Sequence, residues 1–453
     1  MFDAYVQTNR DRFLAELVEF CRIPSVTSEG DDGREAAQWV QRRLEAIGAE
    51  VELIALDGAP PVVYAEVGPP GAERTLLIYN HYDVQPPDPL ELWETPPFEP
   101  QVRAGHLYAR GVADNKANVV SRIQAVEAWQ ATRGELPVRI KWIVEGEEEM
   151  GSPHLALLAE RHGHRFADAH GCLWESGYKD ADGRYLLYCG LKGIAYFELR
   201  ARGAQSDLHS SMGTLVPNPA WRLVWALSTL KAPDETILVE GLMDHVRPPD
   251  PDELEYVRRL PFDATALRER YGVAAFVGNV EDAEALVRHL YAPTCTICGI
   301  HSGYGGSGSK TVLPSEAVAK VDFRLVPDLT PELVHEVLRA HLDKHGFGDI
   351  EVIPMDGVRP ARSPITSPVA QAAAAAARQV SGLEPVVYPN MAASGPMYTL
   401  CDAFGIPAVG FGVGWTGSNV HAPNENVRLK DYFDGIRLMA AFIEHFGRTA
   451  AAA

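Results

Sequence analysis

The stretch VRIKWIVEGEEEMGS, residues 138–152, combines a buried-type strand with an unusual acidic turn. An apolar, β-branched run stops at Glu145, and Glu147, Glu148 and Glu149 then stand side by side. Three adjacent carboxylates repel one another unless cations or solvent offset the charge. A solvated acidic loop is the ordinary interpretation of such a run. Ligands of open α/β sheets, however, bind outside the carboxyl ends of the strands, so this position favours a metal site.

Composition bounds the possible class of protein. The 453 residues exceed one typical core, and two domains are expected. With 41 Lys+Arg against 61 Asp+Glu, the formal net charge is −20, which disfavours nucleic acid or an anionic membrane as a partner. The N-terminal sequence does not resemble a signal peptide, no stretch reaches the roughly 18 apolar residues of a membrane span, and five of the six cysteines have apolar neighbours. These features predict a cytoplasmic location.

The order of apolar patterns predicts one divided domain and one inserted domain. Strands expected at residues 51–56, 61–67, 75–80 and 138–144, with helices at about 34–47 and 115–130, predict an α/β domain. Its sheet should be mixed, mostly parallel and covered by helices on both faces. After Gly193, strictly alternating strands and helices capped near Asn218 and at Thr330 indicate an α+β domain. We therefore predict domain boundaries at 1–192, 193–362 and 363–453, the first and last forming one domain.

Potential metal ligands follow the other strands of this pattern. His81 and Asp83 come after TLLIYN and point the same way in an extended segment, so Asp83 can accept the second ring N–H of a metal-bound His81. Asp114 begins a helix, Glu175 follows GCLW, and His421 lies in a loop before the last helix. Each alone has an ordinary explanation as a turn, helix cap, strand end or surface residue. Together they supply the histidines and carboxylates that two adjacent divalent ions require.

Seven motifs in order carry a resemblance to a known family. They are NHYDVQP, LYARGVADNKA, EGEEEMGS, SDLHSS, GSGSKTVLP, VDFRLVPD and HAPNEN, between Asn80 and Asn426. The chain resembles the dinuclear zinc/manganese metallopeptidases that include carnosinase-type dipeptidases, carboxypeptidase G, aminoacylase and succinyl-diaminopimelate desuccinylase. The length of the segment between the expected lid helix and GSGSKTVLP most resembles that of the corresponding segment in the carnosinase (cytosolic dipeptidase) branch. The resemblance implies that the divided domain is catalytic and that the inserted domain serves as a lid and for dimerisation.

The resemblance also implies a ligand set for two divalent ions per subunit, with zinc as the first expectation and manganese or cobalt as alternatives. One ion would be held by His81, Asp114 and Glu175. The other would be held by Asp114, Glu149 and His421, with Asp114 as the bridge. In relatives the peptide bond after Asp114 is cis.

The same resemblance assigns the acid–base chemistry. Glu148 would be the general base, Asp83 would orient His81, and Glu147 would keep the ordinary role of a loop residue. A water between two cations loses its proton readily, and Glu148, adjacent to a ligand but not bound, can accept it. The metal-bridging hydroxide would attack an amide carbonyl, and Glu148 would return the proton to the leaving amine.

Substrate residues are implied in the inserted domain and a late loop. His209 would stabilise the developing oxyanion in the partner subunit's site, and Thr311 would also act across a homodimer. Arg324 would grip the substrate carboxylate, a task suited to its bidentate fork. Ser394 and Gly395 match the loop that binds the same carboxylate, although AASGPMY departs from the usual Gly-Gly-Ser-Ile-Pro type of run.

The predicted function is metal-dependent hydrolysis of the amide bond in dipeptides or similar small acylated amino acids with a free carboxylate. Glu175 stands where carnosinase-type dipeptidases generally carry Asp and where carboxypeptidase and acylase members carry Glu. An N-acetyl or N-succinyl amino acid deacylase therefore stays as the alternative. A non-catalytic peptide-binding or scaffold protein is a remote alternative, because it predicts a broken set of ligands, whereas every matching residue is present.

Overall fold

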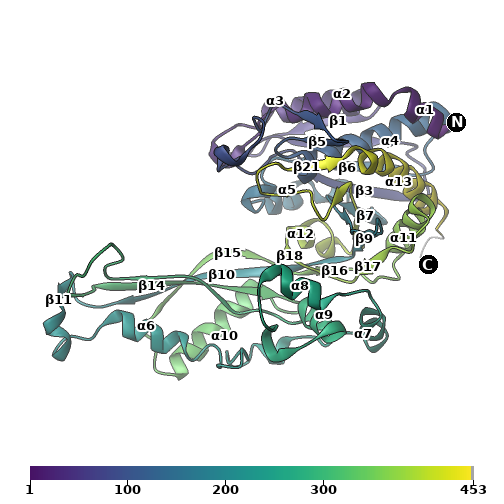
Figure 1. Ribbon diagram of the computed structural model, residues 1–453. Helices are drawn as coiled ribbons and strands as arrows, with labels where there is room; N and C mark the ends of the chain where they lie inside the picture. Colours follow the sequence, from purple (N-terminus) through teal and green to yellow (C-terminus); the bar gives the residue numbers. More distant parts are fainter. Residues whose placement is uncertain (450–453) are drawn as a thin grey trace. The chain divides into compact units, whose positions relative to one another are not determined.

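The computed structural model describes residues 1–449, which form two compact units (Figure 1). Among the described residues, unit 1 comprises Met1–Gly190, Arg362–Pro389 and residues 396–449. Unit 2 comprises Leu191–Ala361 together with Asn390–Gly395. The short return to unit 2 occurs because β18 (Met391–Ser394) pairs in parallel with β10 (Gly190–Arg202).

A ten-stranded mixed sheet forms the centre of unit 1, in the order β1-β2-β6-β3-β7-β19-β9-β8-β20, with β17 beside β9. The strands are β1 (Glu50–Ile54), β2 (Val62–Val67), β3 (Thr75–His81), β6 (Arg139–Glu145), β7 (Gly171–Trp174), β8 (Tyr178–Lys179), β9 (Tyr185–Tyr188), β17 (Val386–Tyr388), β19 (Ala408–Gly410) and β20 (Gly414–Trp415). Strands β6, β3, β7 and β19 are parallel, whereas β1 and β2 extend the sheet antiparallel. Every residue of β3 is buried, as expected of a central strand covered on both faces. The predicted mixed α/β fold is confirmed.

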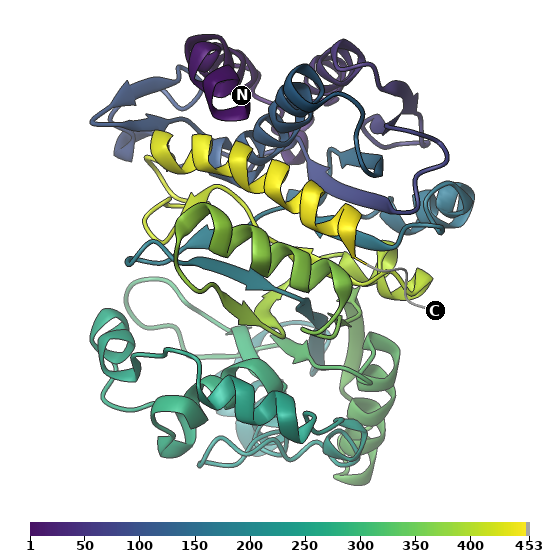
Figure 2. The ribbon, with the colours of Figure 1, turned by 90° about the vertical axis from the view of Figure 1, so that its right-hand side faces the viewer.

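Helices cover this sheet. They are α1 (Phe2–Thr8), α2 (Arg10–Cys21), α3 (Arg34–Ala46), α4 (Ala117–Arg133), α5 (Leu155–His162), α11 (Pro368–Ser381), α12 (Met397–Leu400) and α13 (Leu429–Arg448). Figure 2 shows α13 (yellow) alongside α11 (green), and α13 also packs against α4. A small sheet of β4 (Gln101–Arg103), β5 (His106–Tyr108) and β21 (Asn426–Arg428) lies in the same unit. Among the described residues, no helix has the length and apolar character that crossing a membrane requires.

Unit 2 is an α+β structure built on a second sheet. Its strands β12 (Thr296–Ser302), β14 (Glu316–Leu325), β10 and β15 (Glu351–Val358) are antiparallel neighbours, and β16 (Ala361–Arg362) and β18 pair with β10. Alternate residues of β10 and β14 are buried in one core with residues of α6 (Pro219–Leu227) and α10 (Pro331–Lys344). Both expected caps form, since Asn218 Oδ1 accepts the Ala220 N–H at 2.8 Å and Thr330 Oγ1 accepts the Leu333 N–H at 3.1 Å.

The rest of unit 2 contains three further helices and a short antiparallel pair of strands. The helices are α7 (Pro251–Arg258), α8 (Ala264–Tyr271) and α9 (Asp282–Tyr291). The strands β11 (Leu208–His209) and β13 (Val312–Leu313) pair antiparallel and bring two of the predicted substrate residues, His209 and Thr311, into the same region.

Candidate metal centre

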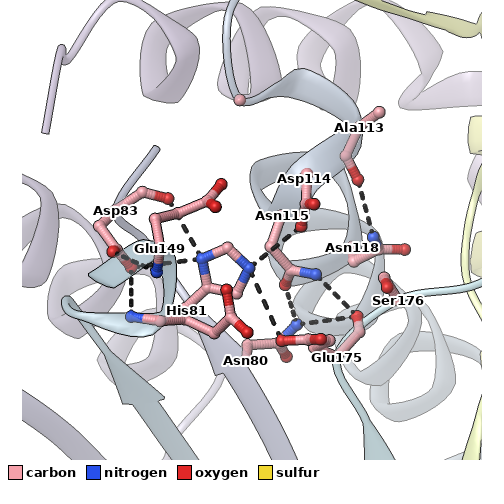
Figure 3. Close-up of polar contacts among 12 residues, drawn as sticks. Asn80, His81, Asp83, Ala113, Asp114, Asn115, Asn118, Glu149, Glu175 and Ser176 are labelled. Carbon is pink, nitrogen blue, oxygen red and sulfur yellow. Dashed lines mark hydrogen bonds and ion pairs between the residues drawn. The ribbon is translucent and has the colours of Figure 1, made fainter. Parts of the chain in front are cut away.

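The ends of parallel strands place the candidate ligands together. His81 is the last residue of β3, Glu175 directly follows β7, and Glu148 and Glu149 lie in the turn after β6. Because β3 is parallel to both β6 and β7, the carboxyl ends of all three strands meet at one edge of the sheet. Figure 3 shows His81 at this edge with Asp114 and Glu175 close to its ring.

Asp114 lies between the two candidate histidines. Its Oδ1 is 3.1 Å from His81 Nε2, and its Oδ2 is 3.4 Å from His421 Nε2. Glu175 Oε2 lies 3.7 Å from His81 Nε2, and Glu149 Oε2 lies 3.1 Å from His421 Nε2. One carboxylate therefore faces two histidines, each of which also faces a second carboxylate.

Ligand atoms gather in two groups at this centre. His81, Glu148 and Glu175 offer atoms within 4.8 Å of one another, and so do Asp114, Glu149 and His421. Together the two groups contain all five predicted ligands and the predicted base.

Asp83 holds both His81 and the acidic turn. Its Oδ1 lies 3.3 Å from His81 Nδ1, and its carbonyl oxygen lies 3.2 Å from the same nitrogen. The two carboxylate oxygens of Asp83 also accept the backbone N–H groups of Glu148 at 3.3 Å and Glu149 at 3.0 Å. Gln85 Nε2 donates to Glu149 Oε2 at 3.0 Å, which fixes that carboxylate further. Asp83 therefore holds the His81 ring through Nδ1, while Nε2 faces Asp114, and it also fixes the backbone of the acidic turn (Figure 3).

Crowded buried charges shift the ionisation of the centre. Burial raises the pKa of Glu175 to about 8, and the Asp114 and Glu149 charges act in the same direction. Burial, followed by the charge of Glu175, raises the pKa of Glu148 well above its usual value. Hydrogen bonds to Asp114 and Glu149 raise the pKa of His421 to about 10. Burial opposes ionisation of Asp114, but its bonds to the histidines outweigh this and lower its pKa.

The donor set fits divalent cations. Glu175 Oε2 is buried and has no hydrogen-bond partner among residues 1–449, although it lies beside a histidine nitrogen. A buried carboxylate oxygen without a partner is costly, and a cation would satisfy it. Imidazole nitrogens with carboxylate oxygens suit Zn²⁺, Mn²⁺ or Co²⁺, and positive charge would also offset the repulsion that raises the carboxylate pKa values.

Glu147 does not have the solvated role that the acidic run suggested. Its side chain is buried, and its Oε2 lies 2.8 Å from His154 Nδ1. The Ser152 N–H donates to the Glu147 carbonyl at 2.8 Å, so the turn folds back toward the start of α5. The ordinary interpretation of a solvated loop is wrong for this residue, because the turn has its own ion pair.

The loop around Asp114 depends on two residues that were missed from sequence. The peptide bond Asp114–Asn115 is cis, as the resemblance implied, and Asn115 Nδ2 donates to the Glu175 carbonyl at 2.9 Å. Glu425 is fully buried and accepts the backbone N–H groups of Ala113 at 2.8 Å and Asp114 at 3.1 Å. The motifs LYARGVADNKA and HAPNEN contain both residues, but an amide and a carboxylate beside stronger ligand candidates gave no separate signal.

The predicted substrate residues lie in unit 2, whereas the candidate ligands lie in unit 1. Arg324 Nη1 donates to Ser394 Oγ at 2.7 Å, and Gly395 directly follows β18. His209 and Thr311 are both exposed, with His209 Nε2 3.3 Å from Thr311 Oγ1. The structure thus forms two pairs of these residues, and their roles in substrate binding stay predictions.

A third group of possible ligands, in unit 2, has a different character. Glu240, His341 and His345 also offer atoms within 4.8 Å of one another. Both ring nitrogens of His341 have protein partners, since Nδ1 accepts the Glu240 N–H at 3.2 Å and Nε2 lies 3.1 Å from the Thr229 carbonyl. Lys344 forms an ion pair with the Glu240 carboxylate. The group is accounted for by contacts within the protein.

Comparison with known proteins places the chain in a family. The sequence model described as peptidase family M20/M25/M40 matches residues 77–445. The human Beta-Ala-His dipeptidase is 30% identical, with 97% of this chain and 90% of that protein covered. The Cys-Gly metallodipeptidase dug1 of Schizosaccharomyces pombe is 31% identical over 75% of this chain and 74% of its own length.

Solved structures agree with the sequence comparison. An M20 family metallo-carboxypeptidase from Sulfolobus solfataricus superposes with a TM-score of 0.90 at 37% identity, covering 96% of this chain and 99% of that one. Human carnosine dipeptidase 1 superposes with a TM-score of 0.77 at 27% identity, covering 99% and 100%. With its gathered histidines and carboxylates and a match over most of its length, the chain belongs to the peptidase family M20/M25/M40.

Proposed function

We propose that the chain hydrolyses the amide bond of dipeptides that carry a free carboxylate, with two divalent ions and Glu148 as general base. The observation that carries this proposal is the Asp114 carboxylate, whose two oxygens face His81 and His421 separately. The dipeptidases and the metallo-carboxypeptidase among its relatives support the same class of reaction.

The proposed roles of the residues follow from their positions. His81, Asp114 and Glu175 would hold one ion, and Asp114, Glu149 and His421 the other. When bound, such ions polarise an amide carbonyl and make a water molecule more acidic. Glu148 takes the proton of the attacking water on its carboxylate and gives it to the leaving nitrogen. Asp83 keeps the His81 ring in place through Nδ1.

Recognition of the substrate carboxylate is proposed for unit 2. Arg324 in β14 lies opposite Ile194 in β10, and paired residues point to the same face of a sheet. Lys192, which lies opposite Ser394, is two residues before Ile194 in β10, so Lys192 and Arg324 occupy the same face. Lys192 is 3% exposed, and its Nζ donates to the Ala292 carbonyl at 2.7 Å. Burial and the nearby Arg324 charge lower the pKa of Lys192 to about 8. A bound carboxylate would offset this positive charge while accepting hydrogen bonds from Arg324.

A homodimer in which His209 and Thr311 act across the interface is part of the proposal. Unit 2 exposes large apolar side chains on α6 and on the edge strand β12, namely Trp221, Trp225, Ile297 and Ile300. Such exposure is typical of protein interaction surfaces. We also propose zinc as the bound metal, and a cytoplasmic location, which the six free cysteines support.

A substrate panel tests the proposed function. Dipeptides, the same dipeptides amidated at the C-terminus, and N-acetyl or N-succinyl amino acids are compared by kcat/KM. We expect dipeptides to be hydrolysed and amidation to lower kcat/KM by about 10- to 100-fold, the effect of losing a hydrogen-bonded charge. Equal rates for amidated and free dipeptides would contradict the proposed carboxylate recognition, and absence of dipeptide hydrolysis would contradict the function.

A second candidate activity is cleavage of N-acylated amino acids. Glu175 favours this activity, because the resemblance assigns Glu at this position to carboxypeptidase and acylase members. The similar structure from Sulfolobus solfataricus is that of a metallo-carboxypeptidase, which agrees with this assignment. Preference for N-acyl amino acids in the same panel would select this activity over dipeptide hydrolysis.

A further inference from the structure

We propose that Glu425 is a positioning residue for the metal centre, because its carboxylate fixes the loop of Asp114 against the loop of His421. This inference rests on the proposed metal-dependent function. Glu425 is four residues after His421, in the segment between β20 and β21. It therefore belongs to the same loop as one candidate ligand while its side chain contacts the loop of another.

Each oxygen of the Glu425 carboxylate accepts two hydrogen bonds. Oε2 accepts Arg110 Nη1 and the Gly111 N–H, each at 2.8 Å. Oε1 accepts the N–H groups of Ala113 at 2.8 Å and Asp114 at 3.1 Å. Arg110 and Glu425 are both 1% exposed. Four N–H groups donate to this one buried carboxylate, so this set of hydrogen bonds defines the course of the backbone into Asp114.

The two loops also pair through their backbones near the same point. Asn426 in β21 pairs with Tyr108 in β5, and the Ala109 N–H donates to the Glu425 carbonyl at 3.1 Å. Residues 109–116 belong to no strand of the described structure, and the Glu425 side chain holds their backbone instead. The separation of 3.4 Å between Asp114 Oδ2 and His421 Nε2 depends on that connection.

A purely structural ion pair is the competing explanation for Glu425. Burying an ion pair gives little net stability, because desolvation offsets the attraction. Three of the four donors to Glu425 are backbone groups of the Asp114 loop, which a pair serving only Arg110 would not require. The two explanations differ in what they predict for metal affinity, since a structural pair affects only the free energy of unfolding.

The test is Glu425→Gln in the zinc-loaded 453-residue chain. The amide nitrogen of Gln cannot accept hydrogen bonds, so one pair of N–H donors loses its acceptor. Samples are dialysed against buffers of decreasing free Zn²⁺, and the remaining metal is measured by mass spectrometry. We expect the free Zn²⁺ concentration that retains half of the metal to rise by about 10- to 100-fold, as for other residues that orient ligands.

Glu16→Gln is the matched control. Glu16 in α2 accepts Arg12 Nη1 at 2.7 Å and Gln124 Nε2 at 2.8 Å, and it lies 3.0 Å from Arg43 Nη2. At Glu16 the same change from carboxylate to amide should lower the unfolding temperature of the metal-free protein and leave zinc retention unchanged. If Glu425→Gln does not fold, Glu425→Asp is measured in its place.

The outcomes separate the inference from the proposed function. Wild-type retention in either Glu425 variant, or an equal loss of zinc in Glu16→Gln, overturns the positioning role. A wild-type chain that retains no zinc at any buffered concentration instead contradicts the proposed metal-dependent function. A loss of zinc confined to the Glu425 variants supports the inference.

Discussion

At the scale of single residues, the acidic turn gives its three neighbouring glutamates different surroundings. Glu149 faces His421, and Glu147 pairs with His154. Glu148 lies with His81 and Glu175, where burial raises its pKa well above the usual value. A raised pKa makes the Glu148 carboxylate a stronger base once it is ionised, and so suits it to accept a proton from water and return it, which is the role that we propose for Glu148.

Replacing Glu148 by Ala tests this role. We expect kcat for dipeptide hydrolysis to fall by about 10²- to 10⁴-fold or more, because the proton acceptor is removed. Metal content should stay near the wild-type value, since Glu148 is not among the proposed ligands. Glu147→Ala makes the same change at the preceding residue. This variant should keep its activity, although the contact between Glu147 and His154 is lost. Retained turnover in Glu148→Ala would exclude it as the base.

The raised pKa values also predict how pH affects the metal-free protein. Burial raises the pKa of Glu175 from 4.5 to about 8, so its folded form keeps a proton that the unfolded chain releases as pH rises above 4.5. The pKa of His421, raised from 6.5 to about 10, contributes stability below 6.5 that is lost as pH rises toward 10. Both effects make the metal-free protein less stable at higher pH.

Bound cations should therefore stabilise the protein more at higher pH, because they replace the protons that the centre otherwise holds. We expect the increase in unfolding temperature on adding buffered Zn²⁺ to be larger at about pH 8.5 than at about pH 6. Thermal unfolding with and without Zn²⁺ at both pH values measures this difference. An increase that is equal or smaller at the higher pH would show that these groups do not exchange protons for metal.

At the scale of elements, the fold could be predicted wherever the signal is local. The apolar runs TLLIYN and VRIKWIV form β3 and β6, and Asn218 and Thr330 cap α6 and α10. Strand patterning and cap chemistry depend only on neighbouring residues, which a sequence displays directly. The gathering of His81, Glu148 and Glu175 could be predicted for a different reason: each follows a strand, and in an open α/β sheet the carboxyl ends of parallel strands meet at one edge.

Features that depend on long-range pairing could not be predicted. Asn390–Gly395 belongs to unit 2 only because β18 pairs with β10, some two hundred residues earlier in the chain, as the Leu191–Met391 pair shows. The burial of Glu425 requires the Asp114 loop, and the pairing of Glu147 requires the turn back toward α5. Neither a hydrophobic period nor a turn motif encodes such contacts.

At the scale of the whole molecule, the proposed chemistry is divided between the two units. Unit 1 holds the five proposed metal ligands, and unit 2 holds Arg324 and Ser394, which we propose for the substrate carboxylate. The excess of 61 Asp+Glu over 41 Lys+Arg includes the partly buried carboxylates of the metal centre, whose repulsion a bound metal would relieve. Metal binding, activity and stability of unit 1 should accordingly change together.

Removal and return of the metal tests the central claim most directly. The ions in the purified chain are counted, and hydrolysis of a dipeptide is followed before chelation, after chelation and after Zn²⁺ is restored. We predict about two ions per chain, loss of turnover in the metal-free protein and its recovery with the metal, as expected of a two-metal centre. Dipeptide hydrolysis that continues at an unchanged rate in the metal-free chain would contradict the claim.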